Sequence, residues 1–281
     1  MAATLALPAC ARGPAAATPL DGIAPLPGPE RGIHRPDAPA VRMLADGPQA
    51  SLRGWVVGPG APVGFILKAG ASDAPPILFL GGDRKGWSAA AMTPIWHAQA
   101  TAAVERAEPG ATILTLGRPY AGDPERWRTR AEIDALAHAI AELSRAFGFG
   151  RADLLGHSSG AHLAVALAQE KGRVRLLAAA SPPLDLMAWH QGWLRHASRA
   201  VRRQYDPIAR VAALTLDAAV LVADPRDTVT PPEAWRAWLS AAIALGKPVS
   251  LAFANGGGED RHGLVGPAAE ALATLRASAA R

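Results

Sequence analysis

Ser158 stands in the pentapeptide GHSSG at 156–160, whose residue types suit a nucleophilic hydroxyl. The run RADLL before it has the apolar character of a buried strand, and AHLAVALAQE after it has the composition of a helix. A G-x-S-x-G sequence at such a turn holds the serine in a strained backbone conformation, and its glycines allow close packing. The strand before the pentapeptide and the helix after it favour a nucleophile at Ser158. The pentapeptide taken without its neighbours would also fit a glycine-rich structural turn.

A serine hydroxyl needs a base within hydrogen-bond reach, and the base is most often a histidine. In nucleophile turns of this kind the chain order is serine, acid, histidine. His262 fits that order because it follows the last predicted strand, after the glycine run 256–258 that could carry it to Ser158. The alternative is an ordinary surface-loop histidine. His157 and His162 are expected to pack beside the site, since their backbone positions direct them away from the attacking side of Ser158.

The acid is expected after the apolar run 217–224, where both Asp224 and Asp227 are candidates. Asp227 has an apolar residue two positions on and a proline four positions on, and Thr230 then reads as the cap of a following helix. We therefore predict that Asp227 orients His262 and stabilises its charged form. Asp224 is expected to stabilise the turn through its side chain.

An oxyanion formed during acyl transfer requires two backbone N–H donors. One is predicted from Ser159, the residue after the nucleophile. For the second we predict Asp83, with Gly82 as the alternative, because the strand PILFL runs directly into these residues. The Asp83 side chain has no role in this prediction, and a plain Gly-Gly turn is the competing interpretation.

The elements that must position these residues follow from the apolar patterning. After Pro75, short apolar runs alternate with helical stretches, which favours a mostly parallel sheet with helices on both faces. An N-terminal antiparallel hairpin and its neighbour are predicted at 41–44, 51–57 and 63–70. The later strands are predicted at 76–81, 111–117, 151–157, 174–181, 217–224 and 248–255, and the helices at 91–107, 129–147, 159–171, 231–245 and 267–280.

Residues 182–213 form a connection that is longer than usual between two strands, and we interpret them as a small lid over the carboxyl edge of the sheet. Trp189 and Trp193 lie in this segment, and Trp87 lies near the predicted oxyanion loop. These three rings are candidates for an apolar acyl pocket. The competing interpretation is that they belong to the core, as aromatic residues more often do.

Residues 1–40 contain many Pro, Ala and Gly residues without periodicity, which is typical of a leader or an extended strap; residues 41–281 are predicted to form one catalytic domain. Cys10 ends the string LPAC, which is similar to the lipidation site of bacterial lipoproteins. The nine residues before it contain no Lys or Arg. Two interpretations stay open: a lipid anchor in the periplasm or cell envelope with a true start further upstream, or a chance match in a cytoplasmic protein.

The composition argues against nucleic acid as a partner. The net charge of +5 comes from 29 Lys and Arg against 24 Asp and Glu, and the basic residues are scattered along the chain. The one concentrated group is Arg195, Arg199, Arg202 and Arg203, which we interpret as a solvated helix face rather than an anion-binding patch.

Residues 50 to 280 resemble α/β-hydrolases of the dienelactone hydrolase and prolyl oligopeptidase-like group. Besides GHSSG, the resemblance is carried by GRPY at 117–120, YDP at 205–207, DPRD at 224–227 and RHG at 261–263, a set similar to that of bacterial secreted or lipoprotein hydrolases. Many relatives have His-Gly where this chain has Gly81-Gly82. The resemblance implies an α/β-hydrolase fold with a mostly parallel sheet of about eight strands, flanking helices and a small lid insertion.

The expected activity is two-step acyl transfer to water on a small-molecule carboxylic ester or short acyl substrate, without a metal or organic cofactor. Two alternatives remain. One is a peptidase of the prolyl oligopeptidase-like type, which aminoacyl amide substrates would reveal. The other is a catalytically silent binding protein of the cell envelope, which would not react with a fluorophosphonate probe.

Overall fold

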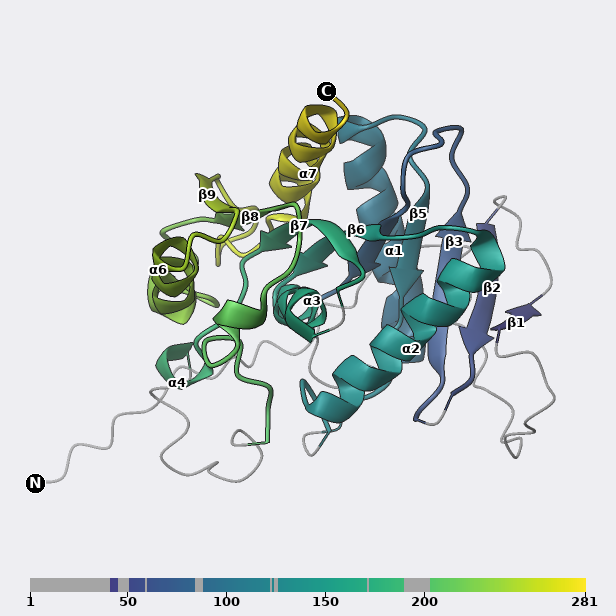
Figure 1. Ribbon diagram of the computed structural model, residues 1–281, viewed down its shortest axis with the longest axis horizontal. Helices are drawn as coiled ribbons and strands as arrows, with labels where there is room; N and C mark the ends of the chain where they lie inside the picture. The colour runs from purple at the N-terminus through teal and green to yellow at the C-terminus, as the bar shows by residue number, and fades with distance from the viewer. Residues whose placement is uncertain are drawn as a thin grey trace, which may run out of the picture.

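A nine-stranded sheet forms the centre of the protein (Figure 1). The computed structural model describes residues 41–44, 51–58, 60–83, 88–121, 123, 126–170, 172–189 and 203–281. The strands are β1 (Val41–Leu44), β2 (Ser51–Val56), β3 (Val63–Lys68), β4 (Ile77–Leu80), β5 (Ile113–Leu116), β6 (Ala152–His157), β7 (Val174–Ala180), β8 (Ala218–Ala223) and β9 (Val249–Phe253).

The strand order is β1-β2-β3-β5-β4-β6-β7-β8-β9. Strands β1, β2, β3 and β5 pair antiparallel, and all pairs from β5 to β9 are parallel. The predicted mostly parallel sheet with flanking helices is confirmed, with nine strands in place of about eight. Because β4, β6, β7 and β8 are parallel neighbours, the loops that follow them meet at one edge of the sheet.

Helices cover both faces of the sheet (Figure 1). They are α1 (Ala89–Ala107), α2 (Arg130–Phe147), α3 (Ser159–Glu170), α4 (Leu186–Trp189), α6 (Arg236–Ala244) and α7 (Val265–Ala279). One face carries α1 and α7, which pack on each other. The other face carries α2, α3 and α6. The single helix expected at 231–245 is instead a 3-10 turn (Pro232–Ala234) followed by α6, because Trp235 leaves the helical conformation (φ −135°) and buries its ring.

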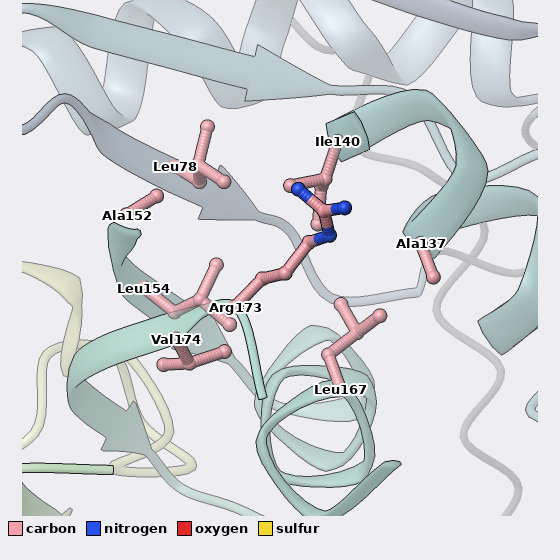
Figure 2. Close-up of a pocket in the computed structure, with 8 residues that line it drawn as sticks. All are labelled: Leu78, Ala137, Ile140, Ala152, Leu154, Leu167, Arg173 and Val174. Atoms are coloured by element: carbon pink, nitrogen blue, oxygen red, sulfur yellow. The ribbon is translucent and has the colours of Figure 1, made fainter. Parts of the chain in front are cut away.

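Each face has its own apolar core. The apolar stripe predicted for α2 is buried, with Ile133, Leu136 and Leu143 at 0% exposure. Helix α3, buried from Ser159 to Gln169, is rich in alanine, which lets its backbone lie close to the sheet. A small recess lies between α2, α3 and the sheet, and the side chain of Arg173 extends across it (Figure 2). Its described lining includes neither Ser158 nor His262.

Several predictions concern residues outside the described ranges: the leader or strap at 1–40 with Cys10, and the middle of the predicted lid, 190–202. The described parts of that insertion contain α4 and a 3-10 turn (Val211–Ala213). Within the described residues, no helix has both the length and the apolar character needed to cross a lipid bilayer.

Candidate active site

Ser158 occupies a sharp turn between β6 and the first residue of α3. Its φ of 54° is left-handed, a conformation that costs a non-glycine residue about 1–2 kcal/mol. The turn is anchored because the Ser158 amide donates to the Ala180 carbonyl at 2.9 Å. Close packing requires Gly160, since a Cβ there would lie 2.1 Å from the Leu80 carbonyl oxygen. The local sequence thus holds a strained serine at the carboxyl edge of the sheet.

Asp227 and His262 are joined by a hydrogen bond of 2.8 Å between Oδ2 and Nδ1. The Asp227 carboxylate also accepts the backbone amides of Val229 (2.8 Å) and Thr230 (2.9 Å) through Oδ1. Burial opposes ionisation of Asp227, but the hydrogen bonds from His262 and Thr230 outweigh it and hold the pKa of this carboxyl below its ordinary value. Since the carboxylate accepts from Nδ1–H, Nε2 of the neutral imidazole is left as the basic nitrogen.

Asp224 forms a separate set of contacts in the preceding turn. Its carboxylate accepts the backbone amides of Arg226 and Gly256, each at 2.9 Å. These two backbone hydrogen bonds are the main reason why the pKa of Asp224 falls to about 2. The structure therefore brings Asp227, and not Asp224, against His262, while Asp224 fixes the turn as expected.

The loop carrying His262 folds back on itself as a tight hairpin. Gly257 and Gly263 exchange backbone hydrogen bonds of 3.0 and 3.1 Å. At Gly256 a Cβ would lie 1.8 Å from the Arg261 carbonyl oxygen, so glycine is required there for close approach. Arg261 has a left-handed φ of 59°, which turns the chain into His262. The glycine run thus positions the imidazole through a compact loop.

His157 ties this loop to the serine turn. Its Nε2 donates to the His262 carbonyl at 2.9 Å, and the two imidazole centroids are 4.9 Å apart. Burial and the neighbouring His262 lower the pKa of His157 to about 4, so it is neutral near pH 7. His162 is fully buried, bonds the Pro183 carbonyl at 3.0 Å and has a pKa lowered by burial to about 3. Both histidines pack beside the turn, as expected.

The loop after β4 lies directly against Ser158. A Cβ on Gly82 would be 2.9 Å from the Ser158 Cβ and 3.3 Å from the His157 carbonyl oxygen. Asp83 follows immediately, and Ser159 opens α3 on the other side. The two residues predicted to supply oxyanion donors therefore flank the candidate nucleophile.

A buried ion cluster behind this loop was missed by the sequence analysis. Arg118, at 0% exposure, bonds both carboxylate oxygens of Glu132 at 3.1 and 3.2 Å, the Ser159 hydroxyl at 2.8 Å and the Asp83 carboxylate. Burial alone would lower the pKa of Arg118, but the two carboxylates raise it above the ordinary value. The Asp83 side chain, to which no role was assigned, thus anchors the loop. The only sequence signal was Arg118 in GRPY.

Of the three tryptophans predicted to line a pocket, Trp87 and Trp193 lie outside the described residues. Trp189 is half-buried at the end of α4, and its indole N–H donates to the Val229 carbonyl at 2.6 Å. Its ring also faces the guanidinium of Arg128, 4.7 Å from the ring centroid. Trp189 therefore connects the loop of Asp227 with a buried arginine.

Solved hydrolase structures share this architecture. A puromycin hydrolase aligns with a TM-score of 0.57 and 18% identity, over 85% of this chain and 39% of that chain. The proline iminopeptidase of Mycobacterium smegmatis aligns with a TM-score of 0.56 and 14% identity, over 81% and 99% of the two chains. An acetyl xylan esterase from a Paenibacillus species aligns with a TM-score of 0.58 and 15% identity, over 85% and 87%. No protein-family model matches the chain, and no curated protein is significantly similar to it.

At these identities the likeness establishes the fold: the chain has the fold of the α/β-hydrolase superfamily, as the sequence resemblance implied. It spans 39% of the length of the puromycin hydrolase. The activities of these proteins differ, and they include peptide and ester hydrolysis.

Proposed function

We propose that the protein is a serine hydrolase that cleaves a carboxylic ester through an acyl-enzyme intermediate. The observation that carries the proposal is the 2.8 Å bond between His262 and Asp227, in a loop docked on the turn that holds Ser158 at a left-handed φ of 54°. The combination of a strained serine, a histidine and an orienting carboxylate is the recurring arrangement for nucleophilic acyl transfer.

In the first step, Ser158 Oγ attacks the ester carbonyl carbon while His262 Nε2 removes the hydroxyl proton. The negative carbonyl oxygen accepts hydrogen bonds from the amides of Ser159 and Asp83, and Asp227 stabilises the imidazolium. Collapse of the tetrahedral intermediate breaks the bond to the alcohol oxygen, which takes the proton from His262.

In the second step, His262 removes a proton from water as the water oxygen attacks the acyl carbon. The bond to Ser158 Oγ then breaks, the serine regains its proton from His262, and the carboxylic acid leaves. Backbone N–H donors stabilise an oxyanion best when they are held in place before the reaction. The hydrogen bonds from Arg118 to the side chains of Asp83 and Ser159 support this role, because they restrain the two residues whose amides are the proposed donors.

The test is labelling by a fluorophosphonate probe, combined with turnover of p-nitrophenyl acetate. Ser158→Ala should abolish labelling and lower turnover by several orders of magnitude. Ser278→Ala is the matched control, because this exposed serine lies on α7 and bonds Thr274 in that helix and Arg281 just beyond its end. An unlabelled but folded parent protein would favour the silent binding protein, and a Ser158→Ala protein as active as the parent would contradict the assignment.

Ester and amide substrates separate the proposal from its nearest alternative. Aminoacyl arylamides tested beside short acyl esters should give the lower kcat/KM. The reverse order would favour the peptidase.

A further inference from the structure

The guanidinium of Arg128 is buried and has no hydrogen-bond partner among the described residues. Arg128 is 0% exposed, and no described residue accepts a hydrogen bond from its Nε, Nη1 or Nη2. An arginine side chain carries five N–H donors, and leaving buried donors of a charged group unpaired is costly. Most natural proteins avoid such a group unless it serves a purpose.

Two aromatic rings cover this cation. The Arg128 guanidinium carbon lies 3.6 Å from the centroid of the Trp127 ring and 4.7 Å from that of Trp189. Both rings are half-buried, so the guanidinium lies directly beneath the surface. The faces of aromatic rings attract the positive charge of the guanidinium, but they do not accept hydrogen bonds from its N–H groups, which point outward in the guanidinium plane. No residue in the described part of the chain therefore uses the hydrogen-bonding capacity of the Arg128 side chain.

The nearby carboxylates are already bonded to another arginine. Asp83 and Glu132 attract Arg128 through space, but their side chains bond the guanidinium of Arg118. Only the backbone amide of Arg128 reaches Glu132, at 2.6 Å. Burial is the main reason why the pKa of Arg128 falls to about 9, and the repulsion from Arg118 adds to it; the side chain stays charged near pH 7.

Arg128 is linked to two loops of the candidate active site through neighbouring residues. Asp83 belongs to the loop that touches Ser158 through Gly82. Trp189 is bonded to Val229, two residues after Asp227. The backbone of Arg128 is itself left-handed, with φ 54°, a conformation that clusters at functional sites.

We propose that Arg128 binds an ionised carboxylate on the substrate, so that the preferred substrates are esters that carry a second, free carboxylate. A carboxylate offers two coplanar acceptor oxygens that match the guanidinium fork. Because the rings of Trp127 and Trp189 cover Arg128, the carboxylate can reach it only if one of these rings is displaced. This inference rests on the proposed ester hydrolysis and specifies its substrate class.

Two ester pairs test the inference. In the first pair the acyl chain differs, p-nitrophenyl hydrogen glutarate against p-nitrophenyl pentanoate; in the second the alcohol differs, p-carboxyphenyl butyrate against phenyl butyrate. The parent protein should prefer the charged member of at least one pair by about tenfold or more in kcat/KM. Arg128→Met should reverse that preference, with the charged ester losing far more than the neutral one, and Arg128→Lys should keep part of it.

Arg126→Met is the matched control, since Arg126 is exposed and also lies over a ring, that of Tyr120. It should keep the parent's preference. If Arg128→Met does not fold, as judged by circular dichroism, the parent protein and Arg128→Lys still decide. Protection of Ser158 from the fluorophosphonate by glutarate, and not by pentanamide, gives a second measurement.

Equal kcat/KM values within both pairs in the parent protein would overturn the inference, even while Ser158-dependent hydrolysis upheld the proposed function. A preference that survives in Arg128→Met would also overturn it. Absence of both labelling and turnover of any ester would instead overturn the proposed function.

Discussion

Asp224 and Asp227 lie three residues apart, and their surroundings give them different tasks. Each accepts two backbone amides, yet only Asp227 also bonds an imidazole. A carboxylate in this position keeps Nε2 of the histidine free to take a proton, whereas an amide side chain could stabilise the opposite tautomer. Exchanging each carboxylate for its amide separates catalysis from turn stability.

Asp227→Asn should lower kcat for p-nitrophenyl acetate by about 10³-fold or more, through loss of the correct tautomer. Asp224→Asn should act mainly on the melting temperature, because its amide group can keep only part of the acceptor geometry. Steady-state kinetics and thermal melts of both variants make the comparison. A larger loss of kcat in Asp224→Asn than in Asp227→Asn would exchange their roles.

At the scale of elements, the contact between β4 and α3 sets the position of the serine turn. Gly160 lies so close to Leu80 that any side chain there must push the helix away from the strand. Gly266, near the start of α7, has nothing within 4 Å of its Cβ position. These two helical glycines therefore have opposite expected responses to the same substitution.

Gly160→Ala should destabilise the protein by about 1–3 kcal/mol as an overpacked site, and slow fluorophosphonate labelling because Ser158 shifts with α3. Gly266→Ala should instead stabilise it by about 0.5–1 kcal/mol, with labelling retained. Urea unfolding and labelling rates measure the two effects. An unaffected Gly160→Ala protein would mean that the strand and helix separate without moving the serine.

The elements also show what the sequence could and could not predict. Apolar runs and the alternation of strands and helices identified all nine strands, because burial imposes a pattern on neighbouring residues. The break at Trp235 was not predicted, since the preference of one ring for the core leaves no periodic signal. The same holds for the Arg118 cluster, whose partners Glu132 and Ser159 are 14 and 41 positions away. The positions of Ser158, Asp227 and His262 could be proposed because chain order and a local motif constrain them.

At the scale of the whole molecule, a buried neutral histidine links folding to pH. His162 is 0% exposed, and burial lowers its pKa from 6.5 to about 3. Between these values the unfolded chain binds a proton that the folded protein does not. The stabilising contribution is thus fully present above pH 6.5 and is lost as the pH falls. His157, with a pKa of about 4, acts in the same direction.

The free energy of unfolding should therefore decline from pH 6.5 to pH 4.5, with His162 contributing at most about 1.4 kcal/mol per pH unit. His162→Gln can still donate to the Pro183 carbonyl but does not titrate, so its decline should be shallower, whatever its stability at pH 7. Urea unfolding at pH 7, 6, 5 and 4.5 measures both slopes. Identical slopes would assign the acid sensitivity to other groups.

All four left-handed, non-glycine backbones among the described residues, Arg128, Ser158, Ser181 and Arg261, lie in or beside the candidate site. Each would be relieved by glycine at little steric cost. Selection of variants for thermal stability alone would thus favour glycine at these positions, and the gain in stability would be accompanied by a loss of activity. Selection for durability in this protein has to be coupled to a readout of turnover.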